Sequence, residues 1–453
     1  MTVEKYHDLL DELIRALDQK DKEGLKELFD ELHSYDKAQF LMDLTPDQRK
    51  LFKHFSDEEL AEIIEELEYD EQRILIEELG FERVASILEK MSSDDAVDLL
   101  GELDEEEKLK ILQLMDDKEE LDIRRLMQYD EYTAGGIMTD EFVSIPITFT
   151  AEDTLQKLRR LAPKAETAYY LYVIDESGVL KGVFSLRELI IAEPDTRVEE
   201  IMFERVVSVP VDMDQEDVAD IMEKYDFLAL PVVKDERILG IITIDDVIDV
   251  LQEETSEDIY KMGGISGSDA DMKEISTSAV KSAKKRIPWL AGLLLVGIMA
   301  GAIIEQFEAT LEAVAVLAVF IPMMTGMAGN TGTQSLTVVV RGLTLGEFED
   351  RGLLSVIRRE AGVGVFIGLA NGFVISIIAM VWQGSPMLGF VIGISLLITL
   401  FVATLAGTVI PLLIDKMNID PAVASGPFIT TVNDLIGLMI YFSIATYFME
   451  QLM

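Results

Sequence analysis

The last third of the chain, from Ile287 to Met453, is almost wholly apolar. Five stretches in it are long enough to cross a hydrocarbon core of about 30 Å, at residues 287–304, 313–340, 361–382, 387–414 and 422–449. Backbone polar groups must be satisfied internally in such surroundings, so we expect each stretch to be a helix. The chain is therefore predicted to be a multidomain membrane protein whose residues 281–453 form a five-helix transmembrane domain.

The charge of the chain lies on one side of this boundary. The net charge is −45, and from Lys284 onward 8 basic residues face 11 acidic ones, which leaves −42 in residues 1–283. Such a surface repels nucleic acid and attracts cations, divalent cations most strongly, so no nucleic-acid partner is expected. An ordinary solvated surface would account for part of this charge.

The ligand types present favour hard metal ions. The chain has no cysteine, and its histidines, His7, His33 and His54, all lie near the N-terminus. Oxygen ligands suit Mg²⁺, Ca²⁺ or Mn²⁺ rather than zinc or copper. We find no nucleophile paired with a base and no phosphate-binding glycine loop, so an enzyme is not expected.

Asp434 lies near the middle of the fifth apolar stretch with no basic residue nearby. A charge at that depth costs roughly 2.5–3.5 kcal/mol on insertion scales, so it normally faces a polar cavity or an ion path. Asp434 is the first candidate functional residue. The alternative is a carboxylate that only hydrogen-bonds to neighbouring helices.

The second stretch contains residues that weaken a helix. Pro322 lacks a backbone donor, and glycines recur after it at Gly326, Gly329 and Gly332. We expect a broken helix whose freed carbonyls line a cation route, although glycines that permit close helix packing are the competing explanation. Gly426 and Pro427 interrupt the fifth stretch about two turns before Asp434, and Asn433 lies beside it. The candidate residues of this route are Pro322, Gly329, Asn330, Thr331, Gly332, Thr333, Gln334, Gly426, Pro427 and Asn433.

Basic residues set the expected orientation. They precede the first stretch and fill the loop between the second and third, whereas the other side carries none. By the positive-inside rule the N-terminus is cytoplasmic and the C-terminus lies outside the cell membrane. No cleavable signal peptide is expected, because the N-terminus is acidic and amphipathic.

Residues 1–131 are predicted to form an acidic all-helical domain, a small superhelix. Punctuating residues recur every 11 to 13 positions, at Thr45, Ser56, Tyr69, Gly80, Ser92 and Asp104. Thr45 with Gln48, and Ser56 with Glu59, have the spacing of capping boxes. Three acids of this domain, Asp94, Asp95 and Asp98, are either solvated surface or part of an ion site.

An internal repeat follows, with copies at 132–200 and 201–244. Ile137, Met138 and Pro146 recur 64 residues later as Ile201, Met202 and Pro210, and each copy continues through a helix and a strand pair. This α/β unit resembles a tandem pair of CBS domains, which often bind adenine nucleotides between the copies. The resemblance implies a ribose contact at Thr243 and Asp246, matched in the first copy by Ser185 and Glu188. Adenine stacking on Tyr170 and Phe227 and a phosphate contact at Arg187 are implied too, with a purely structural role as the alternative.

Residues 245–280 are predicted to form an amphipathic connecting helix and a linker. Seven acids precede the first basic residue of the helix, Lys261: Asp245, Asp246, Asp249, Glu253, Glu254, Glu257 and Asp258. An ordinary linker helix would not need this charge.

The order of these parts resembles the MgtE family of magnesium channels over nearly the whole length. The run Gly329, Asn330, Thr331, Gly332, Thr333 and Gln334 after a proline, together with Asp434, carries the resemblance. It implies a homodimer with one pore on the twofold axis, Mg²⁺ selectivity, and a plug helix that responds to cytosolic Mg²⁺. Regulatory ligands are implied among Asp94, Asp95, Asp98 and the seven acids of the connecting helix, and ATP is implied at the CBS pair. Gly426 departs from relatives with a polar side chain there, so any ligation at that position uses the backbone.

Electrostatics suggests how such a protein would be gated. Two carboxylates about 6 Å apart repel by roughly 3 kcal/mol at an effective dielectric constant near 20. Several such pairs would separate the cytoplasmic parts unless divalent ions intervene, so internal Mg²⁺ is expected to compact them and close the pore. A secondary carrier coupled to Na⁺ or H⁺, and a membrane-anchored metal or nucleotide sensor, are the rival interpretations.

Overall fold

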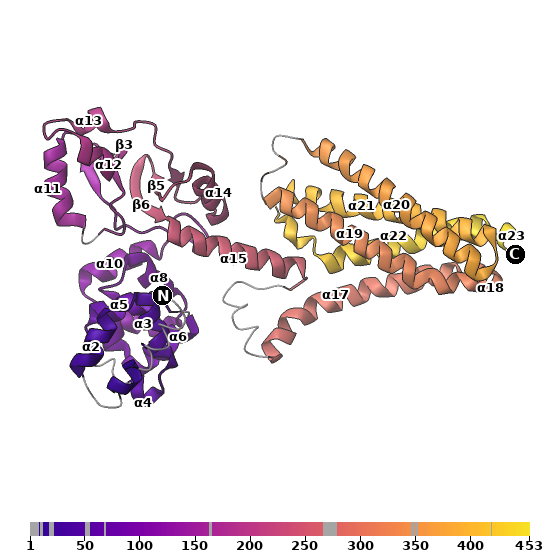
Figure 1. Cartoon of the computed structure of the whole chain (residues 1–453), viewed down its shortest axis with the longest axis horizontal. Coiled ribbons are helices and arrows are strands. Elements are labelled where there is room, and N and C mark those ends of the chain that lie inside the picture. The colour runs from indigo at the N-terminus through magenta and orange to yellow at the C-terminus, as the bar shows by residue number, and fades with distance from the viewer. Residues whose placement is uncertain are drawn as a thin grey trace. The chain divides into compact units, whose positions relative to one another are not determined.

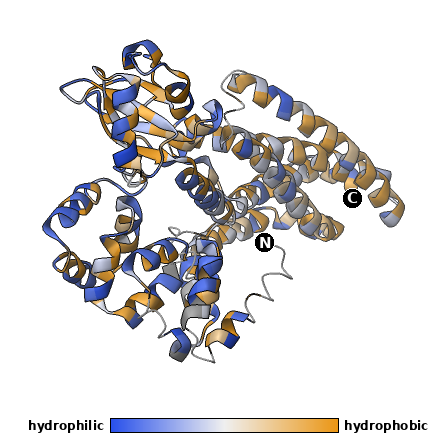
Figure 2. Cartoon of the chain, turned by 60° about the vertical axis from the view of Figure 1, so that its left-hand side comes forward, coloured by the Kyte–Doolittle hydropathy of each residue, from blue (hydrophilic) through white to orange (hydrophobic). Residues whose placement is uncertain are grey.

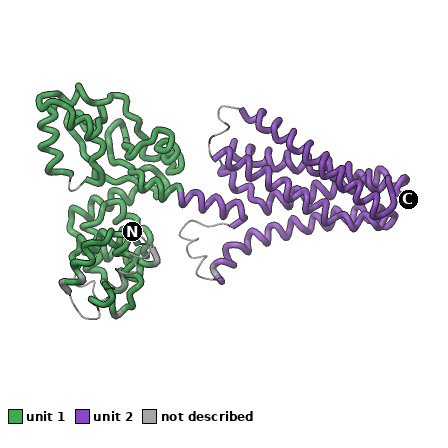
Figure 3. The backbone as a smooth tube through the Cα atoms, viewed as in Figure 1, with its two compact units in different colours: residues 1–251 green, residues 252–453 purple. Residues whose placement is uncertain are grey.

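The computed structural model describes residues 9, 12–17, 22–49, 55–67, 69–162, 165–265, 279–344, 346, 348, 352–417 and 419–453. The chain divides into two compact units, residues 1–251 and residues 252–453 (Figure 3).

Short helices follow one another through the first part of unit 1, as predicted (Figure 1). Ser56 forms the expected capping box, since the Glu59 amide donates to its Oγ (3.2 Å) and its own amide donates to Glu59 Oε2 (2.7 Å). The Thr45 amide and hydroxyl donate to Gln48 Oε1 at 3.0 and 2.8 Å. The helices are α2 (Lys22–Asp30), α3 (Ser34–Asp43), α4 (Pro46–Arg49), α5 (Asp57–Ile64), α6 (Tyr69–Leu79), α7 (Phe81–Leu88), α8 (Ser93–Gly101), α9 (Glu105–Leu112) and α10 (Asp117–Leu126).

Apolar side chains at helical spacing form one core across these helices. Ile63 and Ile64 of α5 pack in the same cluster as Ile87 and Leu88 of α7, and α8 adds Leu100. Each of them is at most 2% exposed. Polar positions between them remain at the surface, which accounts for the acidic exterior.

The internal repeat folds twice into the same three-stranded sheet, as expected for tandem CBS domains. In each sheet the first strand runs parallel to the second and the second antiparallel to the third, with Ser144 opposite Tyr172 in the first copy and Val209 opposite Val232 in the second. The first copy contains β1 (Ser144–Pro146), α11 (Ala151–Leu161), β2 (Tyr170–Ile174), β3 (Leu180–Ser185), α12 (Leu186–Ile191) and α13 (Val198–Ile201). The second contains β4 (Val209–Pro210), α14 (Gln215–Tyr225), β5 (Ala229–Lys234) and β6 (Arg237–Thr243).

The predicted connecting helix is α15 (Ile244–Met262), which begins directly after β6. Val247 and Val250 are its buried residues. The boundary between the two units falls within this helix, after Leu251.

Among the described residues, unit 2 contains five helices long and apolar enough to cross a membrane, the same number and order as predicted. Figure 2 shows these helices coloured mainly as hydrophobic residues. They are α17 (Ala279–Gln306), α19 (Ile321–Thr344), α20 (Leu353–Gln383), α21 (Pro386–Asp415) and α22 (Gly426–Tyr447). Short segments accompany them: α18 (Glu308–Ala313), the 3₁₀ turns η3 (Ala315–Phe320) and η4 (Pro421–Val423), and α23 (Met449–Leu452).

The helix breaks were predicted at the wrong place, because the second and fifth stretches contain irregular backbone at η3 and η4, ahead of their prolines and not at the glycines. α19 is continuous through its glycines, and the irregular backbone, η3, comes before Pro322. Pro322 lies in the first turn of α19, where a helix does not need its missing N–H. Gly426 and Pro427 likewise begin α22 and do not break it ahead of Asp434. Carbonyls freed by a mid-helix break therefore do not line a cation route in these two helices.

The glycines instead allow three helices to approach closely, which was the competing explanation. A β-carbon on Gly332 of α19 would collide with the Asn433 amide of α22. One on Gly407 of α21 would collide with the Gly332 carbonyl oxygen, and one on Gly329 would lie 2.6 Å from Thr430 Cγ2. Small residues at such contacts are how transmembrane helices pack without a hydrophobic driving force.

We expect Gly407→Ala to destabilise the bundle by about 1–3 kcal/mol, because the added methyl group overlaps a backbone atom that cannot move independently. Gly362→Ala in α20 is the matched control, since a β-carbon there meets nothing within 4 Å. The midpoint of thermal unfolding in detergent measures both. Equal midpoints for the two variants would contradict this account of the packing.

Candidate functional site

Five carboxyl groups lie close enough in unit 1 to perturb one another, and we call them the acidic cluster. They are Glu65 at the end of α5, Asp94 and Asp95 in the first turn of α8, Glu166 before β2, and Asp246 in the first turn of α15. Asp94 is only 9% exposed, and its Oδ1 has no hydrogen-bond partner among the described residues. A buried carboxylate oxygen without a partner is costly, so this arrangement calls for a positive charge.

Burial is the main cause of the raised pKa values in the acidic cluster. Burial and then the Asp94 charge raise the pKa of Asp95 to about 6 and that of Asp246 to about 8. Partial desolvation and then neighbouring carboxylates raise the pKa values of Glu65 and Glu166 to about 7, although Glu166 as a residue is exposed, and burial raises the pKa of Asp94. Near neutral pH, protons and metal cations therefore compete for binding to these carboxylates.

The cluster does not form a ready-made direct coordination shell. Within the described ranges, no three Asp, Glu or His side chains are placed to hold one metal ion between them. Mg²⁺ dehydrates reluctantly and is usually held through few carboxylates with several waters retained. The donor set fits a hydrated divalent ion better than a fully stripped one.

A second set of charges lies in unit 2, at the C-terminal end of α15. Lys261 Nζ lies 2.8 Å from Glu257 Oε1 and 2.7 Å from Asp420 Oδ2. Burial alone would lower the pKa of Lys261, but the hydrogen bonds to Asp420 and Glu257 outweigh it and raise the pKa. Burial, followed by the charge of Asp420, raises the pKa of Asp258. Here the protein supplies its own cation to a group of acids.

The predicted regulatory residues therefore fall into different surroundings. Asp94, Asp95 and Asp246 belong to the acidic cluster, and the charges of Asp245 and Asp249 reach Asp95. Asp98 is exposed on α8. In unit 2, Glu257 and Asp258 lie near Asp420, whereas Glu253 and Glu254 are half-buried earlier on the helix.

Asp434 is half-buried on α22, and its Oδ1 is buried without a hydrogen-bond partner among the described residues. No ion pair to it is found within the described part of the chain. Asn433 is 1% exposed, and neither polar atom of its amide has a partner there. Oδ1 of this carboxylate therefore makes no hydrogen bond to neighbouring helices within the described part of the chain.

The predicted residues of α19 point in two directions. Pro322, Asn330 and Gln334 are exposed at intervals of one or two turns along one face. Gly329, Thr331 and Gly332 are buried among the other helices, and the Thr333 hydroxyl donates to the Gly329 carbonyl at 3.0 Å. Gly426 is buried at the start of α22, where a β-carbon would lie 3.4 Å from the Met262 carbonyl oxygen. Only the first set lies on a face that the protein leaves uncovered.

Four acids were missed from the sequence. Glu65 and Glu166 join the acidic cluster through tertiary contacts, and Asp420 pairs with Lys261. Glu360 is 5% exposed within α20, and Arg359 Nε donates to its Oε1 at 3.3 Å. Glu360 comes directly before the predicted third apolar stretch, which begins at residue 361. In the structure the helix already begins at Leu353, so Glu360 lies about two turns inside it.

The proposed ribose pairs are helix caps. The Ser185 amide donates to Glu188 Oε2 at 2.7 Å, and the Thr243 amide and hydroxyl donate to Asp246 Oδ2 at 3.2 and 2.5 Å. Because glutamate can accept the capping hydrogen bond as aspartate does, Glu188 in the first copy and Asp246 in the second both complete the cap. Beyond these pairs, Arg187 is exposed, Tyr170 is half-buried on β2, and Phe227 stacks on Tyr225 with ring centroids 5.3 Å apart.

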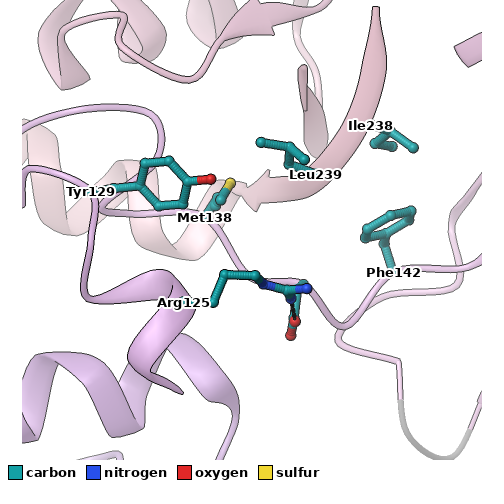
Figure 4. A pocket seen from close by; sticks show the side chains of 7 residues that line it. Arg125, Tyr129, Met138, Phe142, Ile238 and Leu239 are labelled. Atoms are coloured by element: carbon teal, nitrogen blue, oxygen red, sulfur yellow. Dashed lines mark hydrogen bonds and ion pairs between the residues drawn. The ribbon is translucent and has the colours of Figure 1, made fainter. Parts of the chain in front are cut away.

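A cavity of about 290 Å³ in unit 1 lies elsewhere (Figure 4). Arg125 of α10 and Asp140 form an ion pair at its edge. None of the residues proposed for the nucleotide lines it; the lining residues are Arg125, Tyr129, Met138, Asp140, Phe142, Ile238 and Leu239.

Comparison with known proteins covers every part of this architecture. Residues 32–132 match the MgtE intracellular N domain, residues 134–195 and 198–253 match the CBS domain, and residues 321–444 match the divalent cation transporter domain MgtE. The magnesium transporter MgtE of Enterococcus faecalis is 45% identical over 442 residues, which are 97% of this chain and 96% of that protein. The magnesium transporter MgtE of Bacillus subtilis is 46% identical over 72% of this chain and 71% of its own.

Solved structures agree for the soluble part. A crystal structure of the soluble part of a magnesium transporter has a TM-score of 0.54 and 40% identity, covering 55% of this chain and 99% of its own. The cytosolic domain of the Mg²⁺ channel MgtE in complex with ATP has a TM-score of 0.51 and 41% identity, covering 53% of this chain and 99% of its own. With its helical N-terminal domain, tandem CBS domains and five candidate spans, this chain belongs to the MgtE family of magnesium transporters.

Proposed function

We propose that this protein is a Mg²⁺-selective channel of the cell membrane that mediates Mg²⁺ uptake and is closed by cytosolic Mg²⁺. The observation that carries the proposal is Asp434, a carboxylate within a membrane span whose Oδ1 is buried without a partner among the described residues. A buried carboxylate oxygen without a partner destabilises the fold, but it can bind a cation on an ion path. The family's transport of magnesium names the ion.

The pore is proposed to lie on the twofold axis of a homodimer. None of the residues in the apolar window of α17 is buried within the chain, which leaves a surface for a second copy or for lipid. Two copies of Asp434 facing one axis make a minimal anionic ring, and the exposed Asn330 and Gln334 add neutral oxygens. One acid per subunit suits an ion that keeps most of its water. The N-terminus is cytoplasmic and the C-terminus extracytoplasmic.

The acidic cluster is the proposed sensor of cytosolic Mg²⁺. Its carboxylates come from the helical domain, the first CBS copy and α15, so an ion among them ties these three parts together. Without the ion, the repulsion of roughly 3 kcal/mol per close pair favours their separation. The acids of α15 nearer the membrane, including Glu257 and Asp258, transmit the change to unit 2.

ATP is the proposed ligand of the CBS pair. Its support is a relative's cytosolic domain solved in complex with ATP. The exposed Arg187 suits a phosphate, and the half-buried rings of Tyr170 and Phe227 suit a base. The Thr243 and Asp246 pair would have to give up its cap to meet a ribose.

Asp434→Asn should abolish Mg²⁺ flux into liposomes, because the amide keeps the shape of the side chain and removes its charge. Asp415→Asn, an exposed acid at the end of α21, is the control that keeps flux. Recording in an imposed Mg²⁺ gradient without Na⁺ or a pH gradient should show current, as for a channel. Unchanged flux in Asp434→Asn, or no current without a counter-ion, would contradict the proposal.

The fragment of residues 1–265 should lose thermal stability from about pH 5 to about pH 8 in the presence of a chelator. Acids of the folded cluster keep their protons up to about pH 6–8, whereas unfolded Asp and Glu lose theirs near pH 4. The unfolded state therefore binds fewer protons across this range, so the stability of the folded state falls as pH rises.

Asp94→Asn should flatten this pH dependence and raise the unfolding midpoint at pH 8, and Mg²⁺ should do the same for the unmodified fragment. Asp195→Asn, an exposed loop acid, is the control that changes neither. If the unfolding midpoint in chelator does not fall as the pH rises, charge repulsion within the acidic cluster does not destabilise the fold.

Deleting residues 1–251, the whole of unit 1, should leave Mg²⁺ flux intact but insensitive to Mg²⁺ inside the liposome. The deletion removes the acidic cluster and keeps the ion pair between Lys261 and Asp420. A truncated protein that carries no flux, or one still inhibited by internal Mg²⁺, would count against feedback through unit 1.

A further inference from the structure

Apolar contacts seat the last turn of α15 on the membrane bundle. Met262 packs against a cluster formed by α19, η4 and the start of α22. Its carbonyl oxygen faces the start of α22, since a β-carbon on Gly426 would lie 3.4 Å from it. The cluster consists of Leu336, Val340, Ala422, Ala424 and Ile429. The helix that leaves unit 1 therefore ends directly on the helix that carries Asp434.

A glycine cap holds the end of α15 against α17. Gly264 has a φ of +72°, and the amides of Gly264 and Ile265 donate to the carbonyls of Lys261 and Tyr260 at 2.9 and 3.0 Å. This is the left-handed cap that ends many helices. A β-carbon on Gly264 would collide with Nε1 of Trp289 on α17, and that Nε1 is buried. The indole ring therefore covers the end of α15.

Lys261 supplies the positive charge at this contact. Its Nζ lies 2.8 Å from Glu257 Oε1 of α15 and 2.7 Å from Asp420 Oδ2 of the bundle. Asp420 is itself held in place, because its Oδ1 accepts a hydrogen bond from the Ala422 amide at 2.7 Å. The side chains of Lys261 and Asp420 are 27% and 35% exposed, so water screens this pair less than a pair on the open surface. Without the lysine, Glu257 and Asp420 would repel each other across the contact.

We propose that Lys261 is a built-in counter-ion that fastens the membrane end of α15 to the bundle, so that this end stays docked whether or not Mg²⁺ is bound. The acidic cluster at the other end of the helix lacks such a cation, since Asp94 Oδ1 has no partner among the described residues. Because Lys261 belongs to the same chain, its charge is always present at the contact, whereas Mg²⁺ must bind from solution.

The fixed end makes Lys261 a positioning residue for the pore helix, a consequence that rests on the proposed function. The 19 residues of α15 form a rod about 28 Å long. When Mg²⁺ moves the end that carries Asp246, a rod fastened at Met262 moves the start of α22 as well. Asp434 follows Gly426 by about two turns of the same helix.

Trp289 is a native reporter of this docking. The chain has two tryptophans, and Trp382→Phe removes the other one, which is 63% exposed on α20. We expect Trp289 in the full-length protein in lipid nanodiscs to resist quenching by acrylamide equally in chelator and in excess Mg²⁺. Resistance to quenching that appears only with Mg²⁺ would overturn the proposal.

Lys261→Gln in the same background should release the contact in chelator, because Glu257 and Asp420 then repel each other. Trp289 emission should shift to longer wavelength, and quenching should become at least about twofold more efficient as the indole meets water. Excess Mg²⁺ should reverse part of this change by replacing the lost positive charge. Unchanged quenching in Lys261→Gln would overturn the role of the lysine.

Three further variants control this experiment. Lys261→Arg keeps the charge and should behave as the parent protein. Lys416→Gln removes an exposed lysine directly after α21, close to Asp420 in sequence, and should change nothing. Gly264→Ala puts a methyl group against the indole ring and should raise quenching at any Mg²⁺ concentration.

Mg²⁺ flux tests the positioning role separately. Inhibition of Lys261→Gln by Mg²⁺ inside the liposome should need a concentration several-fold higher than for the parent, and Lys261→Arg should restore the parent value. An unchanged concentration for half-inhibition in Lys261→Gln would overturn the positioning role. Because the fluorescence of Trp289 does not depend on transport, the docking proposal and the channel proposal can each fail without the other.

Discussion

Carboxylates held away from water without a protein cation are the constraint on which this structure depends. Asp94 in unit 1 and Asp434 in a candidate membrane span both have a buried oxygen with no partner among the described residues. Burying a lone charge destabilises a fold, so a cation that binds beside such a group lowers the free energy of the folded state. An unpaired carboxylate that lies between domains can therefore act as a cation sensor. One that lies within the bilayer can form part of an ion path.

Helix α15 shows how one amphipathic helix can carry acids into two environments. Asp246 near its start belongs to the acidic cluster of unit 1, whereas Glu257 near its end shares Lys261 with Asp420 in unit 2. In the second place the protein provides the counter-charge itself, and in the first it does not. An ion from solution can therefore change the free energy of the first set more than that of the second.

The membrane bundle combines an apolar core with close contacts at small residues. Gly332 and Gly407 bring three helices close enough for Asn433 to pack against a backbone, and the same contact buries polar atoms that lipid cannot satisfy. Glycines that suggested a broken helix are in fact compatible with a straight one, because neighbouring helices hold it in place. Propensity measured in water is a weak guide where tertiary packing decides.

The elements and their order could be predicted from the sequence alone: five apolar stretches, a duplicated α/β unit and a helix capped by Ser56, because periodicity and capping are local. The sequence also singled out Asp434, since an isolated charge in an apolar stretch is visible without a fold. Which acids lie close together depends on the tertiary fold. Glu65, Asp94 and Glu166 are separated by up to about a hundred residues, and no spacing rule joins them. The tertiary fold also decided that glycines in α19 serve packing, because a close contact is a property of two helices and cannot be read from one.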